Sequence, residues 1–188
     1  ILIERHLISV EHGEERGHKG AVIDDSQSVS LMVNEEDHLR LQALQSGLRL
    51  ADAWTQASRI DDELGAVLPY AYSRSWGYLT ACPSNVGTGL RVSVLMHLAG
   101  LTHMKQLGQV LNASQKLGLA VRGFYGEGSQ AMGNLVQLSN QATLGLSETD
   151  ILENLETRVR QIVTHEREAR KRLLEGNRIE MEDRVWRS

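Results

Sequence analysis

The order of strand-like and helix-like segments is the feature that most restricts how this chain can fold. Segments rich in β-branched and apolar residues often follow one another without an intervening helix. Residues 119–141, "LAVRGFYGEGSQAMGNLVQLSNQ", are typical of two strands joined by a glycine-rich turn. A parallel sheet would need a strict alternation of strands and helices, which the chain lacks. We therefore predict an α+β fold.

The first part of the chain is predicted to be rich in strands. Residues 1–10, "ILIERHLISV", are apolar and β-branched, so they indicate a strand. Further strand-like segments follow at 21–25, 28–34, 70–81 and 91–98, and the last of these is also compatible with a helix. Within the second of them, alternation predicts that Val29, Leu31 and Val33 share the apolar face.

Four segments have the spacing of amphipathic helices. Residues 35–48 place Leu39, Leu41 and Leu44 on one side, and their first turn is acidic, which the helix dipole favours. A second helix is indicated by apolar residues three or four apart: Leu50, Trp54, Ala57, Ile60 and Leu64. Residues 104–117 predict a third helix, and a fourth is expected to begin at a capping box after Ser147.

Composition limits the classes of protein that fit. A chain of 188 residues with 41% hydrophobic and 23% charged residues suits one globular domain. Its net charge of -4 argues against direct nucleic-acid binding, and no apolar run predicts a membrane span or a signal peptide. The single cysteine fits a cytoplasmic location. The first residue is not methionine, so we expect a piece of a longer protein.

Three polar clusters lie at the ends or turns of these elements: "NEEDHLR" at 34–40, "CPSNVGTGLR" at 82–91 and "RGFYGEGSQ" at 122–130. Together they contain carboxylates, a thiol and three arginines. Each also has a purely structural explanation: a helix N-terminus, a tight loop or a hairpin turn. From the individual segments, these alternatives stay open.

The three clusters would suit phosphoryl transfer to a basic nitrogen if they converged. Guanidinium groups bind phosphate oxygens in pairs, and carboxylates hold a cation and accept a proton. The chain has no G-x-x-x-x-G-K-[ST] loop and no complete G-x-G-x-x-G motif. Any nucleotide would therefore be held by arginine side chains.

Taken together and in order, these clusters resemble the guanidino kinases, the ATP:guanido phosphotransferase family. The resemblance rests on "VNEEDHLR", "LTACPSNVGTGLRVSV" and "VRGFYGEGSQAMGN", and it spans essentially the whole chain. The segments "LSNQATLGLSETDI" and "IEMEDRVWRS" are most similar to the bacterial protein arginine kinase branch. The resemblance implies the catalytic fold of that family, an antiparallel β-sheet flanked by helices in a glutamine-synthetase-like domain.

The resemblance also implies roles for particular residues. Glu36 and Glu127 would hold the substrate guanidinium, one of them acting as the base, and Cys82 would lie beside it. Three arginines would bind the ATP phosphates: Arg40, Arg91 and Arg122. His6 would lie near the nucleotide base, and Glu35 would lie near Mg²⁺ through water. The implied activity is ATP-dependent phosphorylation of arginine side chains in proteins, with adaptor proteins and a homo-oligomer among the expected partners.

Two departures from the family pattern affect these expectations. Gln130 stands where relatives commonly carry an acid, and an upstream S-x-R-x-R motif is missing. We therefore expect residues 1–188 to be a single, partial C-terminal catalytic domain without the small N-terminal domain, and to be weakly active or inactive alone. Two alternatives remain: a kinase of a small free guanidino compound, and a truncated, non-catalytic binding module.

Overall fold

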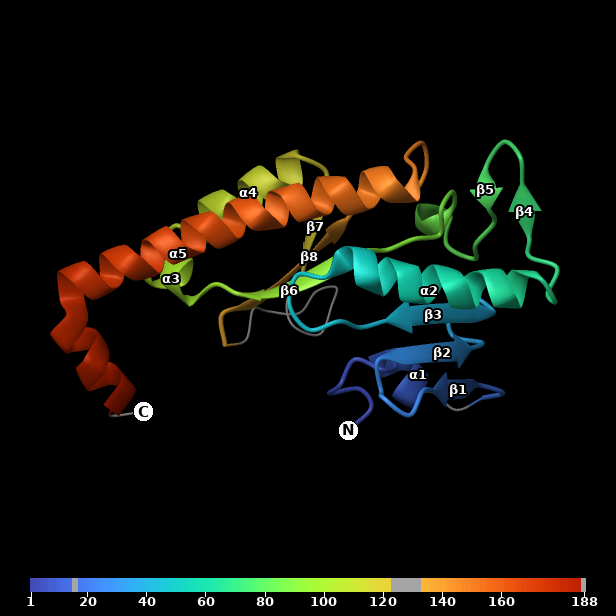
Figure 1. Ribbon diagram of the computed structural model, residues 1–188, viewed down its shortest axis with the longest axis horizontal. Helices are drawn as coiled ribbons and strands as arrows, with labels where there is room; N and C mark the ends of the chain where they lie inside the picture. Colours follow the sequence, from blue (N-terminus) through green and yellow to red (C-terminus); the bar gives the residue numbers. More distant parts are fainter. Residues whose placement is uncertain (15–16, 123–132, 187–188) are drawn as a thin grey trace. The chain divides into compact units, whose positions relative to one another are not determined.

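The computed structural model describes residues 1–14, 17–122 and 133–186 (Figure 1). The chain divides into two compact units, each of which is described by itself. Unit 1 consists of residues 1–90 and 143–148, and unit 2 of residues 91–142 and 149–188. Among the described residues every strand pair is antiparallel, and helices accompany the sheets, so the predicted α+β fold is confirmed.

The main sheet of unit 1 is an antiparallel meander of β1 (Gly20–Ile23), β2 (Val29–Val33) and β3 (Leu39–Ala43). The turn between β1 and β2 is organised by Asp24, whose carboxylate accepts the amides of Ser28 at 2.8 Å and Val29 at 2.6 Å. A hydrogen bond from the Ser26 hydroxyl and these two amides lower the pKa of Asp24 to about 2.

The N-terminal segment differs from the prediction of a strand. Residues 1–9 form successive turns and lead into the short helix α1 (Val10–Glu14). Their amides bond locally, for example Arg5 to the Ile1 carbonyl at 3.0 Å and Leu7 to the Leu2 carbonyl at 2.9 Å. Amides used in local turns cannot join a sheet ladder, so the apolar, β-branched composition was misleading here.

This segment also changes which face of β2 is buried. Ser30 and Met32 are completely buried, whereas Leu31 and Val33 of the predicted apolar face are partly exposed. The Ser9 amide lies 3.4 Å from the Met32 sulfur, so the N-terminal turns cover the Met32 face. The division of β2 into two faces was predicted; burial of the face that carries Ser30 and Met32 was not, and Val29 at the start of the strand is buried as well.

A larger correction concerns residues 39–43, which were predicted to be helical and form strand β3. Leu39 and Leu41 are two residues apart, a spacing that fits a strand face as well as a helix turn. Pairing with β2 satisfies the backbone here. The acidic residues before β3 therefore form a hairpin turn, not the first turn of a helix. The next predicted helix is confirmed as α2 (Leu50–Gly65).

Residues 70–81, predicted as one strand, form a small hairpin of β4 (Tyr72–Ser73) and β5 (Gly77–Tyr78). The cysteine loop follows it and contains the 3-10 helix η1 (Pro83–Asn85). Tyr78 and Gly87 exchange backbone hydrogen bonds of 2.8 and 3.2 Å, which fasten the hairpin to this loop.

Unit 2 contains a second antiparallel sheet in the order β6 (Ser93–His97), β8 (Leu135–Asn140), β7 (Leu119–Arg122). β6 resolves the open choice between strand and helix for residues 91–98. The predicted pairing of the strands within 119–141 is confirmed, although residues 123–132 between them lie outside the described part of the chain.

Three helices complete unit 2: α3 (Ala99–His103), α4 (Leu107–Lys116) and α5 (Glu148–Trp186). Residues on α5 three or four positions apart are buried: Ile151, Leu155, Val159, Ile162, Glu166 and Ala169. They form a core together with strand residues such as Val136 and Leu138. Within the described ranges, no helix combines the length and the apolar character that a membrane span requires.

Candidate functional site

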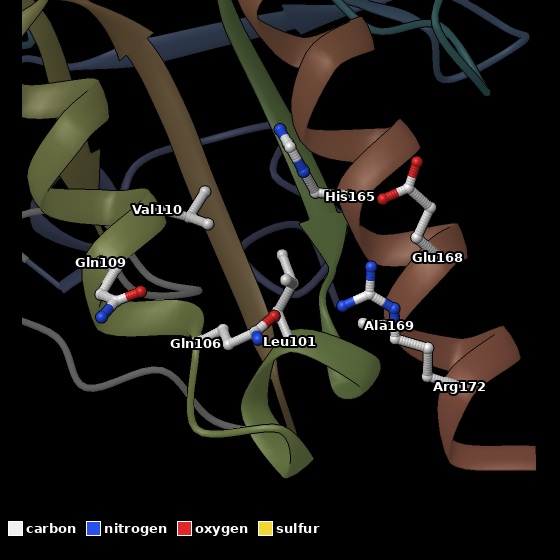
Figure 2. Close-up of a pocket in the computed structure, with 8 residues that line it drawn as sticks. All are labelled: Leu101, Gln106, Gln109, Val110, His165, Glu168, Ala169 and Arg172. Atoms are coloured by element: carbon white, nitrogen blue, oxygen red, sulfur yellow. The ribbon is translucent and has the colours of Figure 1, made fainter. Parts of the chain in front are cut away.

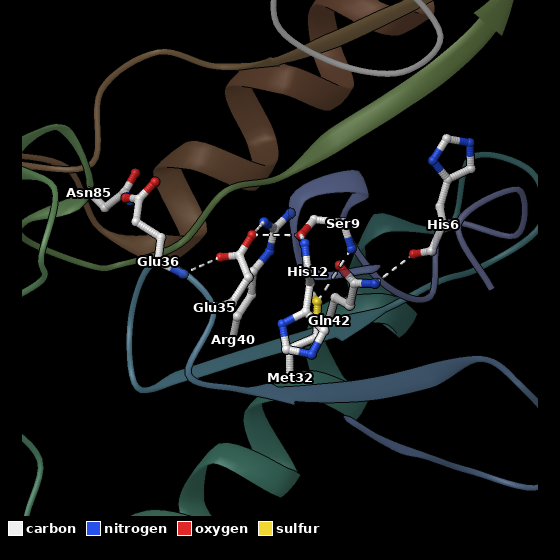
Figure 3. Close-up of polar contacts among 9 residues, drawn as sticks. All are labelled: His6, Ser9, His12, Met32, Glu35, Glu36, Arg40, Gln42 and Asn85. Atoms are coloured by element: carbon white, nitrogen blue, oxygen red, sulfur yellow. Dashed lines mark hydrogen bonds and ion pairs between the residues drawn. The ribbon is translucent and has the colours of Figure 1, made fainter. Parts of the chain in front are cut away.

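The "NEED" segment forms the turn between β2 and β3 (Figure 3). Asn34 adopts a left-handed conformation, with φ of 56°, and its amide bonds to the His38 carbonyl at 2.9 Å. Asparagine tolerates this conformation better than most residues. The turn thereby presents Glu35, Glu36 and Asp37 at one end of the sheet of unit 1.

Glu35 is held firmly by three donors. Its carboxylate accepts the Ser9 hydroxyl at 2.7 Å, an Arg40 guanidinium nitrogen at 2.9 Å and the Glu36 amide at 2.7 Å. Burial by itself raises the pKa of the Glu35 carboxyl, but the three donors outweigh it, and the net pKa is lowered. Glu35 is therefore a fixed negative charge.

Glu36 is the exposed carboxylate of the turn. One oxygen accepts the side-chain amide of Asn85 at 3.1 Å, and Asn85 belongs to the cysteine loop. The neighbouring Asp37 accepts the Ala81 amide of the same loop at 2.6 Å. Two hydrogen bonds thus join the "NEED" turn to the cysteine loop. These two motifs were predicted to form one site.

Cys82 begins η1 and is a half-buried free thiol. Its sulfur lies 3.0 Å from the Ser84 hydroxyl. The loop is anchored from the other side by Thr143, whose carbonyl accepts the Thr88 amide at 3.0 Å. Gly87 is required here, because a Cβ on it would lie 2.3 Å from the Thr143 carbonyl oxygen. Cys82 is therefore held in place from both sides of its loop.

Arg40 lies beside Glu35 within the hydrogen-bond network, and His6 lies at its edge, beyond Gln42 (Figure 3). Arg40 projects from β3, and its side chain is 46% exposed beside Glu35. The His6 carbonyl accepts the Gln42 side-chain amide at 2.5 Å, which joins the N-terminal turns to β3. The His6 ring points away from Glu35 and Arg40 in this view.

The remaining predicted residues are distributed differently. Arg91 directly precedes Val92 and β6, and Arg122 is the last residue of β7, so both belong to unit 2. Val92 lies beside Asn140 at one end of β8, and Arg122 pairs with Gln137 nearer the other end. Glu127 and Gln130 lie outside the described residues. Unit 1 therefore brings together Glu35, Glu36, Arg40 and Cys82, the part of the site that can be described as one arrangement.

Sequence reasoning missed the residues that hold this arrangement in place. Ser9, Asp37, Asn85 and Thr143 make the hydrogen bonds described above, and none was predicted to do so. Asp37 and Asn85 stand inside the motifs, so their position was a usable signal. Ser9 and Thr143 lie far from their partners in sequence and gave no signal.

A pocket of about 390 Å³ lies in unit 2, between the α3–α4 region and α5 (Figure 2). Its lining combines apolar and polar side chains: Leu101, Gln106, Gln109, Val110, His165, Glu168, Ala169 and Arg172. Neither Arg91 nor Arg122 is among them, so this pocket and the predicted phosphate-binding arginines are different parts of unit 2.

The fold and the "NEED" turn with its cysteine loop define a class of protein, and comparison with known families identifies it. Residues 1–169 match the family described as "ATP:guanido phosphotransferase, C-terminal catalytic domain". The chain belongs to the ATP:guanido phosphotransferase family. This confirms the resemblance inferred from the three polar clusters.

The curated relatives narrow the resemblance to one branch. The protein-arginine kinase of Halalkalibacterium halodurans is 53% identical over 188 residues, which cover 100% of this chain and 53% of that protein. The protein-arginine kinase of Halothermothrix orenii is 51% identical, with 100% and 54% covered. The chain thus spans about half the length of the curated relatives that it matches.

Solved structures of the family are similar as well. The duplicated taurocyamine kinase from Schistosoma mansoni, solved with transition state analog components, matches with a TM-score of 0.79 and 28% identity. The match covers 88% of this chain and 24% of that one. Lombricine kinase matches with a TM-score of 0.68 and 28% identity, over 88% of this chain and 49% of that one.

Proposed function

We propose that the protein carrying this chain transfers the γ-phosphoryl group of ATP to the guanidinium of arginine side chains in proteins. The observation that supports this most directly is the pair of hydrogen bonds joining the "NEED" turn to the cysteine loop. They place an exposed carboxylate, Glu36, beside the loop of the thiol Cys82. The two curated relatives described above, about half identical to this chain, are both named protein-arginine kinase.

Glu36 is suited to hold the substrate guanidinium. It is exposed, and the only donor recorded for it among the described residues is the Asn85 side-chain amide, so lone pairs remain for a planar cation. The guanidinium is protonated at physiological pH and is a poor nucleophile, so it must give up a proton as its nitrogen attacks phosphorus. Glu36, or Glu127 from the other motif, accepts that proton, while Cys82 lies beside the substrate.

Arg40 is suited to bind a phosphate. Glu35 engages one nitrogen of its guanidinium, and the side chain is half exposed, which leaves donors for an incoming anion. Arg91 and Arg122 complete the proposed set of ATP-binding arginines, and His6 is proposed to contact the base. The Glu35–Arg40 pair fixes the direction in which Arg40 points.

Magnesium would be bound only indirectly by Glu35. Three donors already occupy this carboxylate, so it fits a water-mediated contact better than direct ligation. Within the described ranges, no three His, Cys, Asp or Glu side chains gather closely enough to hold a metal ion. When bound, the ion supplies charge neutralisation on the ATP phosphates.

The proposal includes the cytoplasm as the compartment, because Cys82 is a free thiol that a reducing environment preserves. It also treats residues 1–188 as part of a single catalytic domain, which makes phosphoryl transfer by this piece alone slower than by the full-length protein. We also propose that the full-length protein binds adaptor proteins and forms a homo-oligomer.

A second candidate is phosphorylation of a free guanidino compound. Two similar solved structures are kinases named for taurocyamine and lombricine, which favours it. Their identity to this chain, 28%, is about half that of the protein-arginine kinases, so we rank it second.

The test is a competition with the full-length protein. Free L-arginine, creatine and an arginine-rich protein are each supplied with ATP, and phosphoarginine is identified by mass spectrometry alongside acid-labile phosphate. Phosphate mainly on the protein supports the proposal. Phosphate mainly on a free compound supports the second candidate, and no transfer to any of them favours a non-catalytic binding module.

A further inference from the structure

An exposed aromatic surface lies next to the cysteine loop. Residues 67–79 carry several large apolar side chains in contact with solvent, which we call the hairpin patch: Val67, Leu68, Tyr72, Trp76 and Leu79. Tyr72 is 59% exposed and Trp76 is 58% exposed. These residues lie after α2, in the segment that contains the β4–β5 hairpin. Figure 1 shows this hairpin following α2. Large exposed apolar side chains gathered in one short segment are typical of an interaction site.

The hairpin patch is built on a rigid group of tyrosines. Tyr78 packs edge-to-face against Tyr70, with ring centres 5.9 Å apart, and against Tyr72, with ring centres 5.2 Å apart. Tyr70 also lies against Gly65 at the end of α2. Tyrosines fixed in this way offer ring faces and edges to a partner at little cost in side-chain entropy.

Carboxylates surround the same tyrosines. Burial raises the pKa of Tyr70 to about 12, and the negative charge of Asp61 adds to this rise. Burial also raises the pKa of Tyr78, with further contributions from Asp61, Glu148 and Asp62. Within residues 59–80, the two arginines, Arg59 and Arg74, are outnumbered by the three carboxylates of Asp61, Asp62 and Glu63. Aromatic rings with nearby carboxylates attract cations.

The patch is continuous with the candidate site. Tyr78 exchanges two backbone hydrogen bonds with Gly87 of the cysteine loop. Cys82 follows Tyr78 by four residues, so their Cα atoms lie within about 14 Å of each other. Suppose that the reacting arginine of a peptide lies at Glu36 and Cys82. The peptide residues on either side of this arginine would then reach as far as the hairpin patch.

We infer that the hairpin patch docks the segment of a protein substrate that flanks the reacting arginine, and that it prefers a lysine or arginine in that segment. This inference rests on the proposed function. It adds a selection rule: the chemistry takes place at Glu36 and Cys82, and the patch favours arginines that stand near a second positive charge.

The test uses the full-length protein and three peptides with one reactive arginine. They differ at one position, four residues from that arginine, which is lysine, glutamine or glutamate. The expected order of kcat/KM for phosphoarginine formation is lysine, then glutamine, then glutamate. Trp76→Ala is expected to lower kcat/KM for the lysine peptide by about three- to tenfold, the range of a partly exposed cation–π contact. Asp62→Asn removes an exposed carboxylate and is expected to lower it by about two- to fivefold, the range of a surface ion pair. The glutamine peptide should change less than twofold.

A charge reversal makes the test stricter. Asp62→Lys should move the preference toward the glutamate peptide, with kcat at saturating peptide unchanged, because Asp62 is exposed and lies outside the phosphoryl-transfer site. Val22→Ala is the matched control, since Val22 is 65% exposed on the edge strand β1, away from the hairpin. It should leave all three peptides unaffected.

The possible outcomes distinguish failure of the proposed function from failure of the docking inference. If the unmodified protein phosphorylates no peptide and no protein, the proposed function fails. If it phosphorylates all three peptides equally, or if Trp76→Ala slows them equally, the docking inference is overturned and the function stands. If Trp76→Ala changes the oligomeric mass in ultracentrifugation without changing the peptide preference, a second copy of the chain occupies the patch, and the inference is again overturned.

Discussion

The two units each contain a nearly buried glutamate paired with a half-exposed arginine, and the two pairs differ in what surrounds them. In unit 1, Glu35 accepts Ser9, the Glu36 amide and Arg40, and an exposed carboxylate follows it directly. In unit 2, Glu166 accepts the amides of Gly100 and Leu101 at 2.8 and 2.9 Å. The pairs are chemically alike.

The two pairs differ in what the arginine side chain contacts besides its glutamate. Arg170 binds Glu166 at 2.5 Å and also donates to the His97 carbonyl at 3.0 Å, so it fastens α5 to the end of β6. Among the described residues, the Arg40 side chain interacts with Glu35 alone, and Arg40 stands on β3 beside the "NEED" turn. A carboxylate–arginine pair alone therefore does not indicate function, and an adjacent exposed acid with donors to spare is the better sign.

The largest expected effect belongs to the exposed acid beside the first pair. Glu36→Gln should lower the turnover for phosphoarginine formation by about 10²-fold or more, because it removes a proton acceptor and a contact to the cation. Its melting temperature should stay close to that of the parent, since Glu36 is exposed. Glu11→Gln, an exposed glutamate on α1, is the control. Near-normal turnover in Glu36→Gln would remove this residue from the mechanism.

The second pair should respond in the opposite way. Glu166→Gln removes a buried charge that accepts two amides and an arginine, which should cost about 2–3 kcal/mol of the free energy of unfolding. For a protein of this size, that corresponds to a melting temperature lower by about 4–12 °C. Thermal unfolding measures the loss, and turnover per folded molecule should be unchanged. The exposed Glu168→Gln on the same helix should alter neither. A loss of turnover without a loss of stability would contradict the structural role.

A smaller effect is expected when the arginine of the first pair is changed conservatively. Arg40→Lys keeps the positive charge near Glu35 but loses the planar fork that grips two phosphate oxygens. The KM for ATP should rise by about tenfold. Arg170→Lys is the matched change in the second pair and should leave KM unaltered. If both variants bound ATP normally, Arg40 would have no role in nucleotide binding.

The same comparison shows what the sequence could predict. The apolar spacing was sufficient to predict α2 and α5: α5 buries a stripe of residues along its length, and the apolar side of α2 is buried at Leu50 and half-buried at Trp54 and Ile60. The spacing of Leu39 and Leu41 was ambiguous between helix and strand, and pairing with β2 decided it. The "NEED" and cysteine motifs were predicted to form one site. The hydrogen bond between Glu36 and Asn85 joins residues 49 positions apart, and no local pattern could reveal it.

The smallest expected effect is a pH dependence of the stability that the second pair provides. The pKa of Glu166 is lowered in the folded chain, because its hydrogen bonds and Arg170 outweigh the effect of burial. A group with a lowered pKa stabilises the fold above its unfolded value of 4.5, and this contribution is lost as the pH falls through the folded value. The destabilisation caused by Glu166→Gln should therefore be constant between pH 7 and pH 5 and shrink below pH 4.5. Asp24→Asn provides the contrast, because the folded pKa of Asp24 is about 2 and its contribution should persist to more acidic solutions. Urea unfolding of both variants across this pH range measures the effect. If the Glu166→Gln penalty stayed constant down to the pH at which the Asp24→Asn penalty disappears, ionisation of Glu166 would not contribute to its stabilising role.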